Sequence, residues 1–321
     1  MKDFRHRLAA VTGAGTGMGR ELAIQLATAG AHVALCDVIE KNMTEAAEAC
    51  RAVAPDGVRI TTHDCDVSDE ARVNAFAAEV LAQHATDHVN LLFNNAGIAG
   101  GGGFVAGDRA EWERTFGVCW SGVYNCARAF MPLLVKSEEA VMVNTSSVNG
   151  FWATLGGAQP HTAYSAAKFA VKGFTESLRI DCQINAPHVK VVLVMPGHIG
   201  TSISHNSRAI LGKPEVDDMP PGDIDDVRKQ MKRMGLPADG VTDEQIKEMI
   251  HQRMKSFRDN APMTAAEAAT VILDGVREER WRILVGQDAE KLDQMVREDP
   301  EGVYAPDFAK KLRAAGVFKA E

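Results

Sequence analysis

The stretch Leu8-Ala-Ala-Val-Thr-Gly-Ala-Gly-Thr-Gly-Met-Gly19 decides the fold class of this chain. Its first five residues form a short apolar run, which predicts a buried strand. A glycine-rich turn follows, and the residues from Met18 to Ala29 have a helical pattern. The same alternation continues as far as Thr201, so we expect a parallel α/β sheet with helices on both faces, joined by right-handed crossovers.

The other elements of this alternation are predicted from their apolar periodicity. Further strands are expected at 32–36, 58–63, 89–93, 141–145 and 189–195, with a last strand at 282–285. Helices are expected at 41–54, 69–84, 109–135 and 162–185. Ligands of such sheets bind at the carboxyl ends of the strands, which is where the motifs described below fall.

Composition narrows the class of protein. The chain has 321 residues, a formal net charge of −8 and an ordinary 45% of hydrophobic residues. The negative charge argues against a nucleic-acid partner, and no apolar run is long enough to cross a bilayer. The apolar stretch after the charged N-terminus is too short for a signal peptide, so we expect a cytoplasmic protein. Six scattered cysteines without a C-x-x-C pair predict neither a disulfide framework nor a metal site.

The glycine-rich turn is a candidate phosphate-binding loop. Gly13 and Gly17 permit a tight turn and a close backbone approach, and Gly19 lets the helix pack against the strand. Free N–H groups at the helix start, with Thr16 and Met18 in the same loop, are suited to a pyrophosphate. A glycine loop can be a mere turn, but the strand–loop–helix context favours a dinucleotide site.

Asp37 ends the second predicted strand, 18 residues after Gly19. A carboxylate at this place accepts hydrogen bonds from a ribose 2′-hydroxyl and repels the 2′-phosphate of NADP, which favours NAD. The alternative is a helix-capping aspartate. Arg20 is the one cation near the loop in the sequence, and it leaves NADP open as a second interpretation.

Tyr164-Ser-Ala-Ala-Lys168 places a phenol and an ammonium one helical turn apart, downstream of Ser147. A free tyrosine titrates at about 10, so a phenolate base at neutral pH needs roughly 4 kcal/mol of stabilisation. A lysine charge about 4 Å away supplies on the order of 4 kcal/mol. We expect Tyr164 as general acid/base, Lys168 to lower its pKa, and Ser147 to hold the substrate oxygen. Alone, Tyr-x-x-x-Lys also occurs on exposed helices without any catalytic role.

Together these motifs resemble the classical short-chain dehydrogenases/reductases. The matching pieces are Thr12–Gly19, Asp66-Val67, Asn94-Asn-Ala-Gly97, Ser147, Tyr164 with Lys168, and Pro196-Gly-His-Ile-Gly-Thr201. The resemblance covers residues 8 to about 201. It implies a Rossmann-type, doubly wound sheet of about seven strands in one domain. It also implies a homodimer or homotetramer paired through the two long helices, here about 109–131 and 162–183.

The same resemblance assigns cofactor contacts. It places Asp66 and Val67 beside the adenine ring, and Asn95, Ala96 and Gly97 along the adenosine ribose. Ile199 and Thr201 would bind the nicotinamide carboxamide, in the motif that Pro196 and Gly197 open. Lys168 would hydrogen-bond the nicotinamide ribose next to Tyr164.

Two departures from the family pattern concern the site. Cys119 stands where the family usually has an asparagine that anchors a proton-relay water, and a thiol is a weak hydrogen-bonding group. Either the relay is impaired, or Cys119 is a small buried residue and water or backbone carries the relay. The Ser147–Tyr164 loop is also long, with an insertion at 151–161. Phe151, Trp152 and Leu155 would line an apolar pocket or support the core.

The segment 202–262 is expected to form a substrate lid, and 286–321 a C-terminal helical tail. Two amphipathic helices are predicted in the lid, with stripes at Ile224, Val227, Met231 and Met234 and at Ile246, Met249, Ile250, Met254 and Phe257. Thr242 with Gln245 and Thr264 with Glu267 predict capping boxes. The methionines offer an adaptable apolar surface, either for a bulky apolar substrate or for packing the lid onto the body or another subunit.

The sequence therefore favours an NAD-dependent enzyme that interconverts a secondary alcohol and a ketone, with a small-molecule substrate. The alternative from another class is an NAD-binding sensor or scaffold with little turnover. Cys119 favours that alternative, and the intact Ser147, Tyr164 and Lys168 oppose it.

Overall fold

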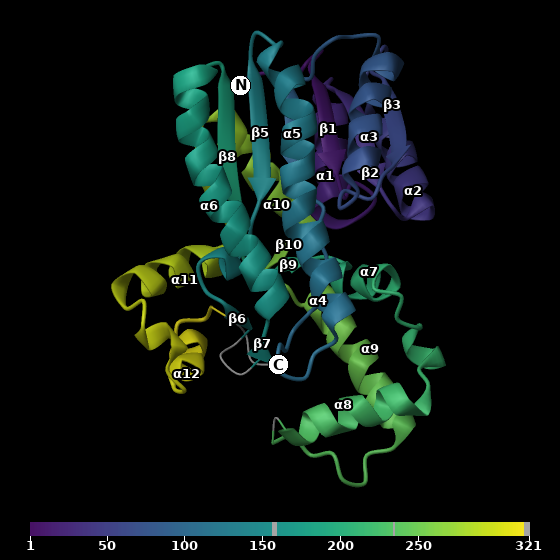
Figure 1. Ribbon diagram of the computed structural model, residues 1–321, viewed down its shortest axis with the longest axis vertical. Coiled ribbons are helices and arrows are strands. Elements are labelled where there is room, and N and C mark those ends of the chain that lie inside the picture. The colour runs from purple at the N-terminus through teal and green to yellow at the C-terminus, as the bar shows by residue number, and fades with distance from the viewer. Residues whose placement is uncertain (156–158, 234, 318–321) are drawn as a thin grey trace.

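The computed structural model describes residues 1–155, 159–233 and 235–317. Its centre is a seven-stranded sheet in the order β11-β8-β5-β4-β1-β2-β3, and every neighbouring pair is parallel (Figure 1). The strands are β1 (Leu8–Thr12), β2 (His32–Asp37), β3 (Ile60–Asp64), β4 (Leu91–Asn94), β5 (Ala140–Thr145), β8 (Val189–Pro196) and β11 (Arg282–Val285). The doubly wound Rossmann-type fold expected from the sequence is confirmed.

Helices cover both faces of this sheet and divide the core into two layers. One layer packs α1 (Gly17–Thr28), α2 (Glu40–Val53) and α10 (Ala265–Arg277) on the sheet. The other layer contains α3 (Glu70–His84), α5 (Gly122–Val135) and α6 (Thr162–Asn185). Two strands start two residues later than expected, because pairing begins only at Ile60 opposite Val33 and at Leu91 opposite Ala9.

The prediction of one continuous helix at 109–135 is wrong in one respect, since the helix is interrupted. It consists of α4 (Arg109–Phe116), a π-helical turn (Gly117–Ser121) and then α5. Gly122 lies against Val67, where any larger side chain would collide. A π-turn inserts one extra residue, and such turns are frequent at functional sites. This one carries Cys119.

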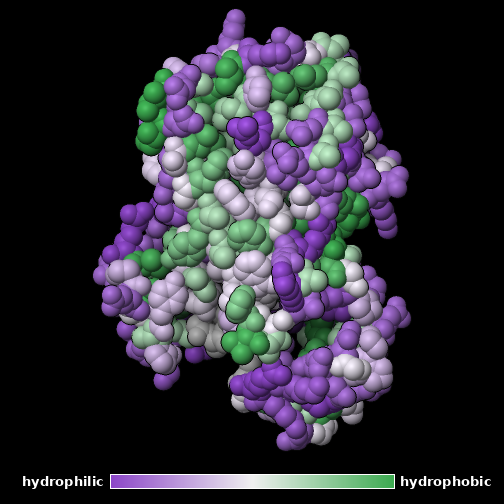
Figure 2. Space-filling model, viewed as in Figure 1, coloured by the Kyte–Doolittle hydropathy of each residue, from purple (hydrophilic) through white to green (hydrophobic). Residues whose placement is uncertain are grey.

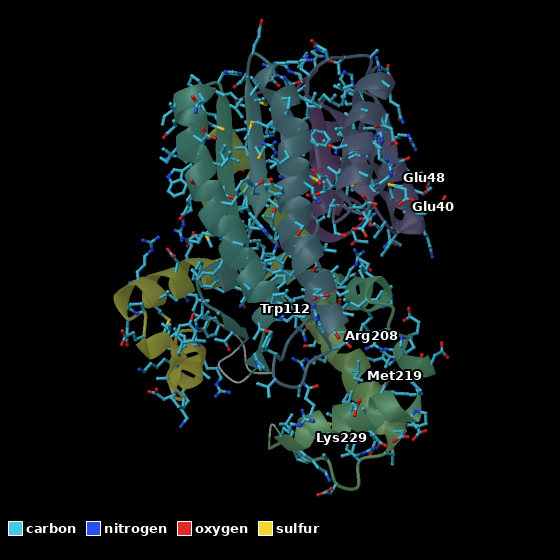
Figure 3. The ribbon with its side chains drawn as sticks, in the orientation of Figure 1. Glu40, Glu48, Trp112, Arg208, Met219 and Lys229 are labelled. Carbon is cyan, nitrogen blue, oxygen red and sulfur yellow. The ribbon has the colours of Figure 1, made fainter. Side chains whose placement is uncertain are left out.

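Residues 202–262 form a lobe below the carboxyl edge of the sheet (Figure 1). It contains α7 (Ile203–Ile210), α8 (Pro221–Arg233) and α9 (Asp243–Asp259), and both predicted capping boxes are confirmed. At its stem, β9 (Ile199–Gly200) pairs with β10 (Met263–Thr264). Met219, labelled in Figure 3, and Met231 are buried in a small core of the lobe itself. These two methionines therefore pack within the lobe rather than against the body, whereas Met234 is outside the described residues.

The C-terminal tail packs on the insertion that follows Ser147. The tail includes α11 (Gln287–Glu298) and α12 (Phe308–Ala314), and the insertion contains the two-residue strands β6 (Thr154–Leu155) and β7 (Gln159–Pro160). The ring of Trp152 lies 5.7 Å from that of Phe308, and its indole N–H donates to the Val303 carbonyl at 3.1 Å. Trp152 thus supports a core with the tail, and Phe151 packs against the same cluster. The side chain of Leu155 and residues 156–158 lie outside the described part of the chain.

Candidate active site

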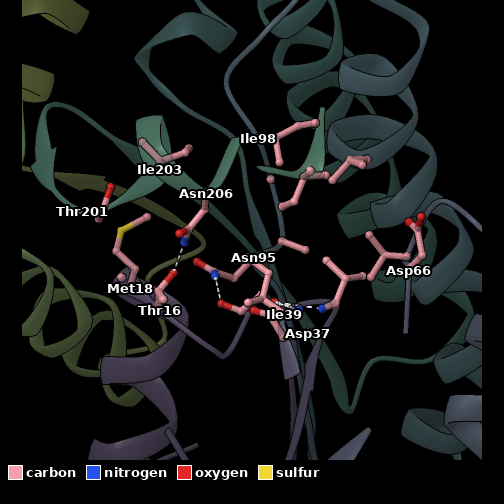
Figure 4. Close-up of a pocket in the computed structure, with 18 of the residues that line it drawn as sticks. Thr16, Met18, Asp37, Ile39, Asp66, Asn95, Ile98, Thr201, Ile203 and Asn206 are labelled. Atoms are coloured by element: carbon pink, nitrogen blue, oxygen red, sulfur yellow. Dashed lines mark hydrogen bonds between the residues drawn. The ribbon is translucent and has the colours of Figure 1, made fainter. Parts of the chain in front are cut away.

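A pocket opens at the carboxyl ends of β1, β2 and β4, above the start of α1 (Figure 4). Gly13 and Gly17 have positive φ angles of 63° and 55°, a conformation that glycine adopts without strain. A side chain at Gly19 would collide with the Gly13 carbonyl, so only glycine allows α1 to begin this close to the loop. The local structure is that of a phosphate-binding loop at a helix N-terminus.

Most of the residues expected to contact a cofactor line this pocket. They are Gly13, Thr16, Gly17, Met18, Asp37, Asp66, Val67, Asn95, Ala96, Gly97 and Thr201. Six others do not line it. Gly19 serves the close helix approach; Pro196 is buried at the end of β8; Gly197 lies against the Asp288 carboxylate of α11; and the Ile199 side chain packs into the core. Tyr164 and Lys168 lie beside this pocket rather than in its lining.

Asp37 is held in one orientation by backbone N–H groups. Its Oδ2 accepts from Gly15 N at 2.8 Å, and its Oδ1 accepts from Val38 N at 2.8 Å and Ile39 N at 3.0 Å. The carboxylate therefore faces the pocket beside the glycine loop, as Figure 4 shows. Arg20, the cation that left NADP open in the sequence, is not among the residues lining the pocket.

Asn95 joins the two loops on either side of the pocket. Its side-chain amide donates to the Thr12 carbonyl at 3.2 Å, while Thr12 Oγ1 accepts from Asn95 N at 3.0 Å and Ala96 N at 3.1 Å. These contacts set the spacing between the ends of β1 and β4. A cofactor bound between the loops would meet a preformed wall.

Ser147, Tyr164 and Lys168 meet where β5 ends and α6 begins. The Ser147 hydroxyl forms a hydrogen bond with the Tyr164 phenol and also accepts from Asn149 N at 3.1 Å. Lys168 is buried, with Nζ 5.4 Å from the centre of the Tyr164 ring and 2.8 Å from the Thr145 carbonyl, to which it donates. The three groups expected to act together are thus adjacent.

The pKa of Tyr164 differs from the expectation. Burial raises the pKa of Tyr164, and the hydrogen bond with Ser147 opposes that rise. Burial also lowers the pKa of Lys168, whose ammonium is engaged by the Thr145 carbonyl. Lys168 was expected to lower the pKa of Tyr164, whereas the largest effect on that pKa in the structure is burial. The physical reason is that both groups are enclosed, and enclosure disfavours each charged form.

Cys119 binds the backbone rather than standing free. Its thiol donates to the Ile98 carbonyl at 3.3 Å and accepts from Ile98 N at 3.4 Å. Burial raises the pKa of this thiol, so it stays protonated. Gly97 lies against both the Lys168 ammonium and the Cys119 sulfur. The thiol thus tethers the π-turn to the loop after β4 directly beside Lys168.

Several residues of the site escaped the sequence analysis. The pocket is also lined by Val38, Ile39, Cys65, Ile98, Arg114, Val118, Ile203, Asn206 and Ile210. Three of these, Ile203, Asn206 and Ile210, belong to α7. Nothing in the sequence indicated that this helix, far along the chain from the glycine loop, reaches the pocket. The imidazole of His161 stacks on the Tyr164 ring with centres 4.7 Å apart, and burial lowers the pKa of His161 to about 4. One sign of this contact was present in the sequence, since His161 stands three residues before Tyr164.

The profile of the short chain dehydrogenase family matches residues 7–211. The chain belongs to the short-chain dehydrogenase family. Over 319 residues this short-chain dehydrogenase is 31% identical to SadH of Mycobacterium tuberculosis, an oxidoreductase by name, covering 99% of this chain and 98% of SadH. Fold, family and oxidoreductase class are therefore shown together.

Solved structures agree with that assignment. A short-chain dehydrogenase/reductase from Burkholderia phymatum in complex with NAD is 28% identical, with a TM-score of 0.74, over 95% of this chain and 98% of that one. A metagenomic short-chain oxidoreductase in complex with NADP is 29% identical, with a TM-score of 0.54, over 61% of this chain and 84% of that one. A nicotinamide cofactor is common to both neighbours. Within the described residues, no helix is long and apolar enough to cross a membrane.

Proposed function

We propose that this short-chain dehydrogenase interconverts a secondary alcohol and a ketone, using NAD. The observation that carries the proposal is the meeting of Ser147, Tyr164 and Lys168 beside the pocket at the glycine loop. Ser147 orients the substrate oxygen, and Tyr164 takes its proton in oxidation or gives one in reduction. The nicotinamide, when bound, accepts or supplies the hydride, and its oxidised ring adds positive charge.

The buried Tyr164 needs that positive charge. Burial raises its pKa, so a phenolate requires cations on more than one side. Lys168 supplies one of them, held 5.4 Å from the ring centre by the Thr145 carbonyl. The Ser147 hydrogen bond lowers the pKa of the phenol further. In this scheme the base is fully active only with the oxidised cofactor in place.

The preference for NAD rests on Asp37. Its carboxylate is fixed by three backbone N–H groups and stands at the pocket wall. A 2′-phosphate there would bring like charges together, and the residues lining this part of the pocket supply no cation beside Asp37. The ribose 2′-hydroxyl of NAD would instead donate to the carboxylate.

A bulky apolar substrate is the class that the lid favours. Ile203 and Ile210 of α7 line the pocket, and the rest of the lobe has its own core behind them. The lobe can therefore move as a unit without exposing the main core. Closing such a lid excludes water from the reacting groups, which suits a large ketone or alcohol.

Assembly through α5 and α6 is part of the proposal. Tyr124 on α5 and Phe169, Ile180 and Ile184 on α6 expose between 42% and 74% of their surface. In Figure 2, hydrophobic residues lie at the upper left of the molecule, over α6. Exposed apolar side chains of this kind mark protein interfaces, so we infer a homodimer or homotetramer. The cytoplasm is the proposed location, since all six cysteines are free and buried.

The first test is NADH formation by the purified protein with NAD and secondary alcohols ranging from small to steroid-sized. Tyr164→Phe should abolish turnover while leaving NADH binding unchanged, because the phenol oxygen is the reacting group. Preference for large alcohols would support the lid assignment. Turnover that survives in Tyr164→Phe would contradict the role of Tyr164 as the acid/base. NADH binding without turnover on any alcohol in the panel would contradict the proposal and favour a sensor.

A further inference from the structure

His198 lies on the segment that connects β8 to the lid, and it contacts two other parts of the chain. Its backbone N–H donates to Oδ2 of Asp288, at the start of α11, at 2.6 Å. Its imidazole Nε2 lies 2.7 Å from the carbonyl oxygen of Phe257, in the last turn of α9. Because a carbonyl oxygen can only accept, Nε2 is the donor. His198 therefore joins the C-terminal tail to the lid.

The contact of this segment with the lid consists of more than one hydrogen bond. The imidazole ring of His198 lies 4.4 Å from the Phe257 ring, centre to centre. Gly200 approaches the Arg258 carbonyl so closely that a larger side chain would collide. The strand that contains Gly200, β9, also pairs with β10, the next strand after α9 (Figure 1). The end of α9 is thus attached to the segment 196–201 at several points.

On the opposite side, the tail and the sheet hold the same segment in place. Asp288 is only 6% exposed, and its carboxylate fills the space beside Gly197, where any side chain would collide with it. The Gly197 N–H donates to the carbonyl of Val285, at the end of β11, at 2.9 Å. The start of the segment is therefore fixed to the body of the protein, and its contacts with α9 lie only one to three residues further along.

The far end of the segment reaches the cofactor pocket. Thr201 lines this pocket, and its side chain lies against Gly17 of the glycine loop. The segment begins at the end of β8, which pairs with β5, the strand that leads to Ser147. A hydride acceptor must come within reach of a substrate held at Ser147 and Tyr164. A nicotinamide would therefore lie beside the segment 196–201.

We propose that His198 is a positioning residue that couples the lid to the nicotinamide end of the pocket. This inference rests on the proposed function, in which a nicotinamide dinucleotide binds between the glycine loop and Tyr164. Asp288 holds the backbone of His198 and Phe257 holds its imidazole, so a shift of α9 changes the position of the pocket wall at Thr201. By reciprocity, a nicotinamide bound against this wall restricts the motion of α9.

The experiment compares NADH with ADP-ribose, which has the same adenosine and pyrophosphate but no nicotinamide. His198→Leu removes the hydrogen bond and the ring contact, whereas His198→Gln keeps an N–H for the Phe257 carbonyl. The matched control is His251→Leu in α9, because the imidazole of His251 lies 3.0 Å from Asp217 within the lid itself. Fluorescence and calorimetry measure the affinities, and thermal unfolding verifies that each variant is folded.

Hydrogen exchange measures the coupling itself. In the wild-type protein NADH should slow amide exchange in α9, and ADP-ribose should slow it much less. His198→Leu should bind NADH about tenfold less tightly, with unchanged affinity for ADP-ribose, and NADH should protect its α9 no more than ADP-ribose does. His198→Gln should retain most of the NADH affinity and of the protection. His251→Leu should retain both in full.

Equal losses of affinity for NADH and ADP-ribose in His198→Leu would indicate general damage to the pocket and would overturn the inference. Unchanged NADH affinity in this variant, or full protection of its α9 by NADH, would also overturn it. The same holds if NADH and ADP-ribose protect α9 equally in the wild-type protein. Failure of the wild-type protein to bind either ligand would instead overturn the proposed function, and this inference with it.

Discussion

Asn206 of the lid donates a hydrogen bond from Nδ2 to Oγ1 of Thr16 in the glycine loop, at 2.7 Å. Ser207, the next residue, accepts from Ala99 N on the other side of the pocket at 2.8 Å. Helix α7 thus bridges the two loops between which a cofactor would lie. The contact joins residues 190 positions apart in the chain and links the lid directly to the phosphate-binding loop.

We expect Asn206→Ala to speed the release of NADH several-fold, because one of the two hydrogen bonds that join α7 to the loops beside the pocket is lost. Stopped-flow displacement of NADH measures that rate. His205→Ala, an exposed neighbour on α7, is the control and should not change it. Equal release rates for wild type and Asn206→Ala would show that the lid does not hold the cofactor.

Asp37→Ala should reduce the preference for NADH over NADPH by tenfold or more, because a like charge near the 2′-phosphate is removed. The dissociation constants of both cofactors give the ratio. Asp64→Asn provides the matched control, since Asp64 pairs with Asp37 across β2 and β3 but is exposed and outside the pocket lining. A ratio that stays constant in Asp37→Ala would rule out Asp37 as the selecting group.

Cys119→Ala should lower both stability and turnover. It leaves the N–H and carbonyl of buried Ile98 without the thiol, at a cost of about 1–2 kcal/mol in the free energy of unfolding beyond the lost packing. Urea denaturation measures this cost. Cys126→Ala, a buried cysteine of α5, controls for the loss of packing alone. Cys119→Ser should retain most of the activity, and equal stabilities of the two alanine variants would contradict the tether.

The stability of the protein should fall as pH drops below 6.5. His84 is buried beside Thr61, and burial lowers its pKa from 6.5 to about 4. Above pH 6.5 the imidazole is neutral in both the folded and the unfolded state. Below pH 6.5 His84 takes up a proton in the unfolded chain, whereas in the folded protein it stays neutral down to about pH 4. This difference lowers the free energy of unfolding by roughly 3 kcal/mol over this pH range.

Urea denaturation at a series of pH values measures that dependence. His84→Gln should make the slope between pH 6.5 and 4 shallower, whereas His88→Gln, at a more exposed histidine, should leave it unchanged. An identical slope for wild type and His84→Gln would assign the acid sensitivity to other groups, such as buried His63, whose pKa is also lowered by burial.

The expectations that failed share a physical cause. The helical periodicity of the sequence continues through Gly117 and Gly122, so it could not show the π-turn between them. That turn accompanies the close approach of Gly122 to Val67, which is a tertiary contact. Strand ends were misplaced by two residues because pairing depends on neighbours that are distant in sequence. The capping boxes at Thr242 and Thr264 were predictable, since both partners of each box lie within four residues.

The sequence by itself determined the fold class, the glycine loop, Asp37 and the Ser147, Tyr164 and Lys168 set. Each of these depends on short-range spacing or on periodicity, which a linear pattern retains. Only the tertiary structure decided that Asn206 reaches Thr16, that Arg114 binds Asp66, and that Trp152 packs on the C-terminal tail. It also decided the pKa of Tyr164, because burial comes from residues throughout the chain and no spacing encodes it.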